Sequence, residues 1–330
     1  MKVLFIGGTG NISTAVSRLA VQRGIQLYLL NRRQRKIDIP GAACIQADIH
    51  QPAQVSQLLQ SHHFDCVVDW IAYEPADIER DIELFRGKTK QFIFISSASV
   101  YQRPVLNPII TEGTPLANPF WQYSRNKIAC EDRLMQAFRT EAFPVTIVRP
   151  SLTYDMYFPI AIGGWNTYTL VDRMKRGQPI IVHGDGSSIW VVTHAEDLAV
   201  GFVGLIGHPN TIGHAFHITS DELLTWDQIY QTIASAAEVE AKMVHIPSDF
   251  IARLNPGLGA GLLGDKISSV IFDNTKIKTF VPEYKAVIPF HLGIRKTLAW
   301  YDEDERRKVV DPAVNADMDA ILAAYQDKVG

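Results

Sequence analysis

Near its N-terminus the chain reads Val3-Leu4-Phe5-Ile6-Gly7-Gly8-Thr9-Gly10-Asn11-Ile12-Ser13, an apolar run that passes straight into glycines. Four consecutive apolar residues are typical of a strand that is buried on both faces of a parallel sheet. The next segment, 12–22, has apolar residues at helical spacing and is followed by Gly24, a typical helix stop. Strand, glycine turn and helix form the setting in which backbone N–H groups bind the pyrophosphate of a dinucleotide. We therefore predict a dinucleotide site, with a plain tight turn as the alternative. Its predicted contacts are Gly7, Thr9, Gly10, Asn11 and Ile12.

The second predicted strand, 26–30, ends at Asn31-Arg32-Arg33. An acidic side chain at this position accepts hydrogen bonds from the ribose hydroxyls of NAD. A guanidinium instead suits the 2′-phosphate of NADP by charge and by shape. Contacts from Asn31 and Arg32 therefore favour NADP, with NAD as the alternative. A solvated basic loop is the other interpretation, because Arg35 and Lys36 continue the positive run.

Further strand and helix patterns alternate along the first half of the chain. Short apolar runs at 43–47, 66–72, 92–95 and 145–148 are separated by helical spacing at 76–85 and after Tyr123. This alternation predicts an α/β fold with a doubly wound parallel Rossmann sheet and a ligand crevice at the carboxyl ends of its strands. Asp48, Ile49 and Ala72 stand at such ends and are predicted cofactor contacts. Asp48 has a second interpretation, as the cap of the helix that begins near Pro52.

The strand 92–95 breaks into the hydroxyl-rich turn Ser96-Ser97-Ala98-Ser99-Val100-Tyr101, and Tyr123-Ser124-Arg125-Asn126-Lys127 opens a helix further on. Tyr123 and Lys127 are four residues apart and therefore share one helix face. An ammonium close to a phenol lowers the pKa of the phenol. A serine hydroxyl nearby can then orient a carbonyl or alcohol oxygen for proton exchange with the tyrosine. An ordinary exposed helix face is the alternative interpretation of this spacing.

Length and composition limit the remaining possibilities. A chain of 330 residues, 47% apolar and 20% charged, suits about two globular domains. We place a dinucleotide-binding domain at 1–150, with returning segments near 187–220, and a smaller, mainly substrate-binding domain at 151–330. A formal net charge of -3 gives no broad basic surface for nucleic acid or an anionic membrane. Three scattered cysteines, no metal-ligand spacing and no long apolar stretch predict a cytoplasmic protein without metal. We expect a monomer or a homodimer.

The C-terminal half is richer in aromatic residues and has weaker patterns. The segment 154–168 is predicted to be a pocket wall or a lid, 255–261 a flexible loop, and the charged tail after Asp302 a peripheral segment. Each aromatic residue is individually more often part of a core than of a pocket wall. The substrate contacts we predict are Tyr73, Ser99, Tyr101 and Trp190, and further candidate walls are Trp121, Tyr154 and Trp165.

In order and spacing these segments resemble the extended short-chain dehydrogenase/reductase family, which includes the nucleotide-sugar epimerases and dehydratases. The matching segments are 7–12, Asp48, 96–101, 123–127, Arg149-Pro150, 184–186 and 194–198. The resemblance implies a nicotinamide cofactor, Tyr123 as the acid/base, and Lys127 as the residue that holds the ribose and lowers the pKa of the tyrosine. It implies Ser97 as the hydroxyl partner, with Ser99 as runner-up. It also implies that backbone groups after Pro150 contact the nicotinamide amide.

Two departures from the family pattern stand out, one in the glycine turn and one that bears on the substrate. Ser13 replaces the usual third glycine, and Trp190 stands where the family commonly has an arginine that grips a nucleotide diphosphate. Loss of that cation disfavours a nucleotide sugar, with Arg149, Arg173 and Arg253 as candidates to compensate. The expected function is NAD(P)-dependent hydride transfer, as an oxidoreductase or epimerase, between nicotinamide and a carbinol or carbonyl carbon of a sugar-like or small carbonyl substrate. The alternative is a non-catalytic, cofactor-binding regulatory or RNA-associated protein on the same fold.

Overall fold

The central sheet of the computed structural model holds seven parallel strands within the described residues, which are 1–34 and 37–329. These strands are β1 (Lys2–Ile6), β2 (Gln26–Asn31), β3 (Ala43–Gln46), β4 (Cys66–Asp69), β5 (Phe92–Ile95), β7 (Val145–Val148) and β12 (Ala215–Phe216). Across the sheet they lie in the order β3-β2-β1-β4-β5-β7-β12. This order is that of a doubly wound Rossmann sheet, and it confirms the predicted fold class.

Helices cover both faces of this sheet, which explains why its strands read as uninterrupted apolar runs. Val3 and Phe5 of β1 pack into a core with α1 (Ser13–Gln22) and α6 (Ala195–Leu205). Leu4 and Ile6 pack into a second core with α2 (Pro52–Leu58), α3 (Pro75–Phe85) and α4 (Gln122–Glu141). All four of these β1 side chains are fully buried. Full burial of each such side chain contributes about 1.5–3 kcal/mol.

The connections from β1 and β4 diverge, because β2 and β3 lie on one side of β1 and β5 lies on the far side of β4. Such a switch point leaves a crevice at the carboxyl ends of the strands. The strand β4 ends at Asp69 rather than at the predicted Ala72, because the Asp69 carboxylate accepts the backbone N–H groups of Ile71 and Ala72 and turns the chain. Residues 195–216 return to the sheet as α6 and the edge strand β12.

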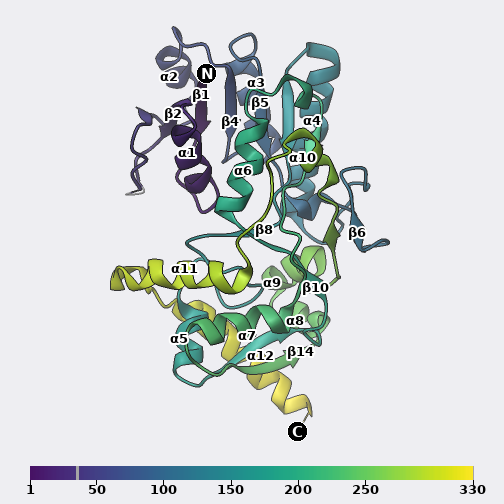
Figure 1. The fold of residues 1–330 in the computed structure, drawn as a ribbon. Helices are drawn as coiled ribbons and strands as arrows, with labels where there is room; N and C mark the ends of the chain where they lie inside the picture. The colour runs from purple at the N-terminus through teal and green to yellow at the C-terminus, as the bar shows by residue number, and fades with distance from the viewer. Residues whose placement is uncertain (35–36, 330) are drawn as a thin grey trace.

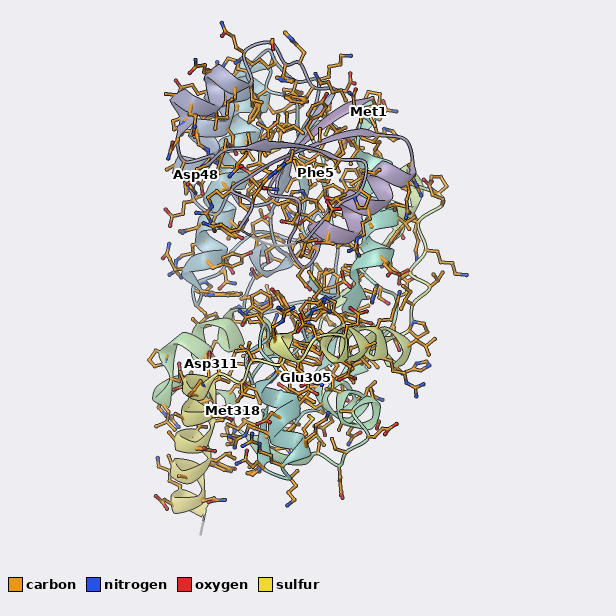
Figure 2. All side chains as sticks on the ribbon, turned by 90° about the vertical axis from the view of Figure 1, so that its left-hand side faces the viewer. Met1, Phe5, Asp48, Glu305, Asp311 and Met318 are labelled. Atoms are coloured by element: carbon orange, nitrogen blue, oxygen red, sulfur yellow. The ribbon has the colours of Figure 1, made fainter. Side chains whose placement is uncertain are left out.

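The rest of the chain forms a second layer below the sheet, with the C-terminus at its far end (Figure 1). Figure 2 shows Phe5 in the upper part and Met318 in the lower part.

The short strands of this region pair as β8 (Leu152–Tyr154) with β11 (Val192–His194), β9 (Pro179–His183) with β14 (Lys242–Ile246), β10 (Ile189–Trp190) with β13 (Leu224–Thr225), and β6 (Ile109–Ile110) with β15 (Ile271–Phe272). Its helices are α5 (Thr169–Lys175), α7 (Trp226–Ala236), α8 (Ser248–Leu254), α9 (Pro256–Gly261), α11 (Phe290–Asp302) and α12 (Pro312–Val329). Trp190 and Trp226 stack at its core with ring centroids 5.6 Å apart. Helix α10 (Thr275–Phe280) instead lies beside α6 in the upper part, and its Ile277 packs into the core that contains Val3 and Phe5.

Two predictions for this region are wrong. The segment 255–261 is not a flexible loop, because Asn255 caps Leu258 N, Pro256 occupies the first helical turn, and the chain continues into a π-helical turn, Leu262–Lys266. The tail after Asp302 is not peripheral, because α12 buries Met318, Ile321 and Leu322 in the lower core. These three lie at helical spacing, so they form one apolar face of α12. In the described part of the chain, no helix is long and apolar enough to cross a membrane.

Candidate active site

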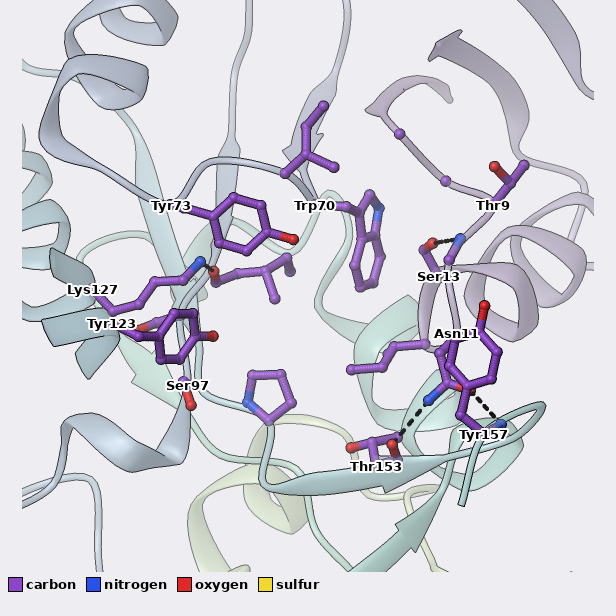
Figure 3. Close-up of a pocket in the computed structure, with 18 of the residues that line it drawn as sticks. Thr9, Asn11, Ser13, Trp70, Tyr73, Ser97, Tyr123, Lys127, Thr153 and Tyr157 are labelled. Carbon is purple, nitrogen blue, oxygen red and sulfur yellow. Dashed lines mark hydrogen bonds between the residues drawn. The ribbon is translucent and has the colours of Figure 1, made fainter. Parts of the chain in front are cut away.

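A cavity of about 700 Å³ runs along the carboxyl ends of the strands, from the glycine turn after β1 to the start of α4 (Figure 3). The predicted cofactor contacts that line it are Gly7, Thr9, Gly10, Asn11, Ile12, Asn31, Arg32, Asp48, Ile49 and Pro150. The predicted catalytic and substrate residues that line it are Ser97, Tyr123, Lys127, Tyr73 and Ser99. Three of the predicted contacts do not line the cavity: Ala72, Tyr101 and Trp190. Arg35 and Lys36 lie outside the described residues.

The glycine turn has a backbone that only glycine adopts without strain. Gly7 and Gly8 have φ values of +98° and +89°. A Cβ atom at Gly8 would lie 2.6 Å from Leu29 Cδ2. Glycine is therefore also required here because a larger residue would clash with Leu29. Ser13, at the position of the usual third glycine, is almost fully buried, and its hydroxyl accepts the N–H of Gly10 at 2.7 Å. The turn is therefore fixed in place before α1 begins.

Asn11 connects this turn to the opposite wall of the cavity. Its Nδ2 donates to Thr153 O at 3.1 Å, and its Oδ1 accepts Tyr157 N at 3.2 Å (Figure 3). Thr153 belongs to β8 and Tyr157 to the aromatic segment that follows it. The glycine turn and this segment, about 140 residues apart in the chain, are thus held together by one amide side chain.

The far end of the cavity carries two cations and one carboxylate. Arg32 and Arg33 both line it after β2, and Asp48 lines it after β3. The Arg32 side chain is 58% exposed, and its Nη1 lies 3.9 Å from Asp48 Oδ2. Asn31 Oδ1 accepts the N–H of Arg33 at 2.9 Å, which holds the loop in a turn. The charge at this end of the cavity is therefore positive overall among the described residues.

At the inner end, α4 presents Tyr123 and Lys127 on one face, as their spacing predicts. Lys127 Nζ donates to the carbonyl oxygens of Ile95 and Ala72, both at 2.7 Å. The same ammonium lies 5.8 Å from the centroid of the Tyr123 ring and 4.7 Å from that of Tyr73. Figure 3 shows Tyr123, Ser97 and Lys127 on one side of the cavity, facing the glycine turn on the other.

The expected lowering of the Tyr123 pKa is not what the structure shows. Burial raises the pKa of Tyr123 above its ordinary value of 10, and the nearby Tyr73 acts in the same direction. A hydrogen bond with Ser97 opposes this shift without reversing it. Tyr123 is therefore a neutral phenol at neutral pH, ready to donate a proton.

Lys127 also makes the stability of the protein depend on pH. Burial lowers the pKa of Lys127 from 10.5 to about 8. Between these two values the unfolded chain holds a proton that the folded protein has lost, so the free energy of unfolding rises with pH through this group. We therefore expect the free energy of unfolding of the wild type, relative to Lys127→Met, to increase from about pH 8 to about pH 10 in urea titrations. A difference that stays constant or decreases over this interval would contradict the lowered pKa of Lys127.

The serine turn after β5 is held by a chain of hydroxyl groups. Ser97 Oγ lies 2.9 Å from Ser99 Oγ, which accepts a hydrogen bond from Ser124 Oγ at 2.8 Å. Ser124 belongs to α4, so the turn is tied to the helix that carries Tyr123. Asn118 Nδ2 donates to Ser99 O at 2.8 Å and to Gly264 O at 2.7 Å, which joins the turn to the π-helical segment. Ser97 is left half-buried at the cavity wall, whereas Ser99 is almost fully buried.

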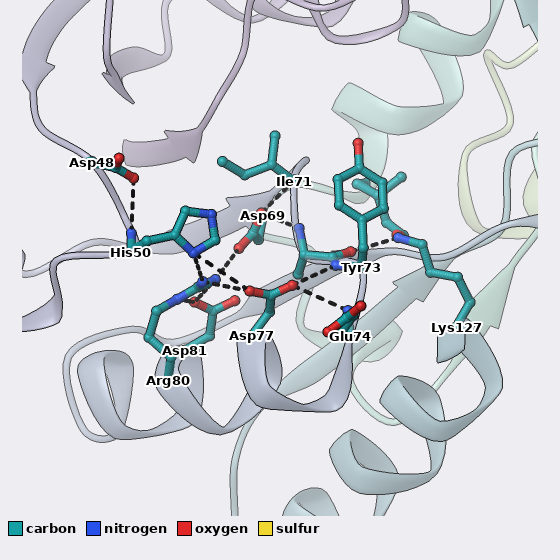
Figure 4. A network of polar contacts seen from close by, with 12 residues as sticks. Asp48, His50, Asp69, Ile71, Tyr73, Glu74, Asp77, Arg80, Asp81 and Lys127 are labelled. Atoms are coloured by element: carbon teal, nitrogen blue, oxygen red, sulfur yellow. Dashed lines mark hydrogen bonds and ion pairs between the residues drawn. The ribbon is translucent and has the colours of Figure 1, made fainter. Parts of the chain in front are cut away.

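A buried carboxylate network shapes the segment that leads to Tyr73 (Figure 4). Arg80 Nη2 lies 3.3 Å from Asp69 and 2.9 Å from Asp81, and Arg80 Nη1 lies 2.7 Å from Asp77. Burial and the neighbouring Asp69 raise the pKa of Asp81, and Arg80 opposes this shift. Asp77 Oδ2 accepts Tyr73 N at 2.8 Å, while Asp69 fixes the turn that directs the Ala72 carbonyl at Lys127.

Glu131 extends the functional face of α4 by one more turn, and the sequence analysis missed it. Its carboxylate accepts Arg149 Nε at 3.0 Å and Arg149 Nη2 at 2.6 Å. Both side chains are almost fully buried. The pair anchors α4 to the end of β7, directly before Pro150, which lines the cavity. The signal was present in the sequence, because Tyr123, Lys127 and Glu131 follow one another at intervals of four.

The aromatic candidates divide between cavity wall and core. Tyr73, Trp121 and Trp165 line the cavity. Tyr101, Tyr154 and Trp190 are almost fully buried in the lower core instead, and Tyr101 Oη is hydrogen-bonded to His217 Nδ1 at 3.0 Å. Lining residues that the sequence analysis did not single out include Trp70, Ser151, Thr153, Tyr157, Asp265 and Lys266. Lys266 Nζ lies 4.8 Å from the centroid of the Trp190 ring.

Comparison with known proteins agrees with this geometry. The family model described as "NAD dependent epimerase/dehydratase family" matches residues 3–219. The chain is similar to 2′-dehydrokanamycin reductase of Streptomyces kanamyceticus, 22% identical over 259 residues that span 77% of this chain and 71% of that protein. It is also similar to the chloroplast stem-loop binding protein of 41 kDa b of Arabidopsis thaliana, 26% identical over 265 residues that span 76% of this chain and 67% of that protein.

Solved structures share the fold over almost the full length. Epimerase Mth375 from Methanothermobacter thermautotrophicus matches with a TM-score of 0.76 at 17% identity, covering 92% of this chain and 93% of that chain. A UDP-glucose 4-epimerase from Bifidobacterium longum, solved in complex with NAD+ and UDP, matches with a TM-score of 0.74 at 16% identity. The match covers 94% of this chain and 100% of that chain. The sheet order, the glycine turn and the family match together confirm the resemblance seen in the sequence. The chain therefore belongs to the NAD dependent epimerase/dehydratase family.

Proposed function

We propose that this protein is an NADP-dependent oxidoreductase or epimerase that transfers a hydride between nicotinamide and a carbinol or carbonyl carbon. Residues 1–150 and the returning segments near 187–220 bind the cofactor, and residues 151–330 mainly bind the substrate. The observation that carries this proposal is the convergence of Ser97, Tyr123 and Lys127 at the inner end of a cavity whose other end is the glycine turn. An acid/base tyrosine beside a dinucleotide-binding turn suits this reaction class.

The residues of the cavity fit a dinucleotide. The positive φ values of Gly7 and Gly8 set the tight turn whose backbone would approach a pyrophosphate. Asn31, Arg32 and Asp48 would contact the adenosine half of the cofactor. The Pro150 backbone and Lys127 would hold the nicotinamide half, and the bound nicotinamide would supply or accept the hydride.

Side chains of the protein transfer the proton that accompanies the hydride. In reduction, the Tyr123 phenol gives its proton to the carbonyl oxygen of the substrate as the carbon gains the hydride, and solvent then reprotonates the phenolate. Ser97 donates a hydrogen bond to the same oxygen and stabilises its developing charge. The Lys127 ammonium stabilises the phenolate that forms. Because burial raises the pKa of Tyr123, its phenol is protonated at neutral pH and can act as the proton donor.

The substrate we propose is sugar-like or a small carbonyl compound. The reductase from Streptomyces kanamyceticus and the UDP-glucose 4-epimerase from Bifidobacterium longum, both similar to this chain, support the class of substrate. The similarity to a protein named as a stem-loop binding protein is the reason to consider RNA as an alternative partner. The intact Ser97, Tyr123 and Lys127 and the net charge of -3 do not favour that alternative. A cytoplasmic monomer or homodimer stays a prediction.

The direct test is turnover. The purified protein is supplied with NADPH or NADH and a panel of nucleotide sugars, free sugars and small carbonyl compounds, and the oxidation of the cofactor is followed by absorbance. Epimerase activity is followed in parallel by product analysis with catalytic cofactor. Absence of cofactor binding, or of any turnover that depends on Tyr123, would overturn the proposed function.

Cofactor preference gives a second test. Arg32→Ala is expected to weaken NADPH binding about tenfold, because an exposed guanidinium that contacts a phosphate loses a charge-assisted hydrogen bond. NADH binding should change little, since NADH has no 2′-phosphate. Dissociation constants are measured by fluorescence titration, with Arg253→Ala as the matched exposed arginine far from the cavity. Tighter binding of NADH than of NADPH to the unmutated protein would contradict the NADP preference.

A further inference from the structure

Two charged residues at the substrate end of the cavity have no role in the proposed hydride transfer. Asp265 and Lys266 line the cavity from the π-helical turn Leu262–Lys266. π-Helical turns are rare and are frequent at functional sites. The two residues lie on the same lining as Tyr123, Ser97 and Trp121.

The π-helical turn is fixed directly against the catalytic elements. Asn118 bonds both Gly264 O and Ser99 O through one Nδ2, so the turn and the serine turn share a partner. Gly264 faces Trp121, where an added Cβ would lie 2.7 Å from the Cβ of Trp121. Trp121 immediately precedes α4. The position of Lys266 relative to Tyr123 is therefore set by backbone packing and not by a mobile loop.

The charges on this turn do not balance. Asp265 Oδ1 lies 3.1 Å from Arg103 Nη2, and Asp265 Oδ2 is bonded to Lys266 Nζ. Two cations thus share one carboxylate, which leaves one net positive charge on largely buried groups. Arg103 is almost fully buried behind the turn, whereas Lys266 reaches the cavity. A partly desolvated excess charge at a cavity wall attracts a group of opposite charge.

Lys266 also supplies a positive charge next to Trp190, where related proteins commonly have an arginine. The three arginines considered as replacements are engaged elsewhere: Arg149 with Glu131, Arg173 with Asp319 and Arg253 with Asp249. None of these three lines the cavity. The Lys266 ammonium lies over the Trp190 ring, 4.8 Å from its centroid, so a cation is present next to that position although the sequence there has none.

We propose that Lys266 binds an anionic group of the substrate, so that the substrate is a carbonyl or carbinol compound carrying a carboxylate or a phosphate group. This inference rests on the proposed function and names its substrate class. Asp265 and Arg103 hold the ammonium in place, and the anion completes the charge balance of the turn. Arginine forks are the usual partners of a diphosphate, whereas a single lysine suits one compact anionic group.

The test compares matched compounds and two matched lysines. Glucose, glucuronate and glucose 6-phosphate are assayed with NADPH, and acetate and inorganic phosphate are titrated into the NADP-saturated protein by calorimetry. The wild type is expected to favour the anionic compounds, and Lys266→Met is expected to weaken anion binding about 10- to 100-fold. Lys266→Arg should retain the preference. Lys278→Met, which removes the same charge from an exposed ion pair with Asp221, should leave anion binding unchanged. Comparison of the carboxylate and phosphate arms identifies the anion.

The outcomes separate this inference from the proposed function. Equal binding of acetate and phosphate to the wild type and Lys266→Met overturns the anion site, whether or not any compound is turned over. Tyr123-dependent turnover of neutral and charged compounds at equal rates leaves the proposed function standing and overturns the substrate class. Lys266-dependent anion binding together with turnover that ignores Tyr123→Phe overturns the proposed function and the substrate role with it.

Discussion

Tyr123→Phe is expected to lower kcat by about 10²- to 10⁴-fold, which is the usual contribution of a positioned general acid or base. The substitution removes only the hydroxyl that exchanges a proton with the substrate. The ring contacts of Tyr123 with Trp121 and Tyr73 can remain, because phenylalanine keeps the same ring. Binding of NADPH should therefore change little. The measurement is steady-state oxidation of NADPH with the best compound of the panel, alongside fluorescence titration of the cofactor.

The control for this prediction is Tyr325→Phe, which removes a tyrosine hydroxyl from α12, outside the cavity lining. That variant should match the wild type in kcat. Turnover that is unaffected by Tyr123→Phe would show that proton transfer occurs elsewhere, and the proposed mechanism would fall. Cofactor binding without any turnover in the wild type would instead favour the non-catalytic alternative.

The features that the sequence predicted well are those with a local physical cause. The strand β1 is buried on both faces, so it is an unbroken apolar run whatever packs against it. The glycine turn needs positive φ at Gly7 and Gly8, and few other residues adopt that backbone. Tyr123 and Lys127 share a face because any helix places residues four apart together. None of these inferences depends on a distant part of the chain.

The features that the sequence did not predict depend on contacts made across the fold. Tyr73 and Trp190 are both large aromatic residues near strand ends, yet Tyr73 is half exposed and Trp190 stacks on Trp226 in the lower core. Lys266 follows a glycine-rich segment with no periodic pattern, and only tertiary packing through Asn118 brings it to the cavity. The raised pKa of Tyr123 comes from burial, which spacing along a helix does not reveal.

Glu131→Ala is expected to lower the free energy of unfolding by about 3–5 kcal/mol, as is usual when one partner of a buried ion pair is removed. Arg149 would keep its weaker contacts with Glu112 O, at 3.3 Å, and with the Tyr101 ring, 4.9 Å from its Cζ. Its guanidinium cannot shed its charge, so the folded state must hold an unpaired buried cation. Urea unfolding measures the loss. The same variant should reduce turnover, because Glu131 anchors the helix that carries Tyr123 and Lys127.

The double variant Glu131→Leu/Arg149→Met separates the charge from the packing. Replacing both partners of a buried pair with apolar residues of similar volume is often neutral, so the double variant should recover most of the lost stability. Arg253→Ala, which breaks an ion pair whose side chains are 66% and 68% exposed, should change the free energy of unfolding by at most about 1 kcal/mol. If Glu131→Ala were as mild as Arg253→Ala, the pair would be open to water and would not fix α4 against β7. Recovered stability without recovered turnover in the double variant would show that the ion pair positions Tyr123 and Lys127 beyond holding the fold together.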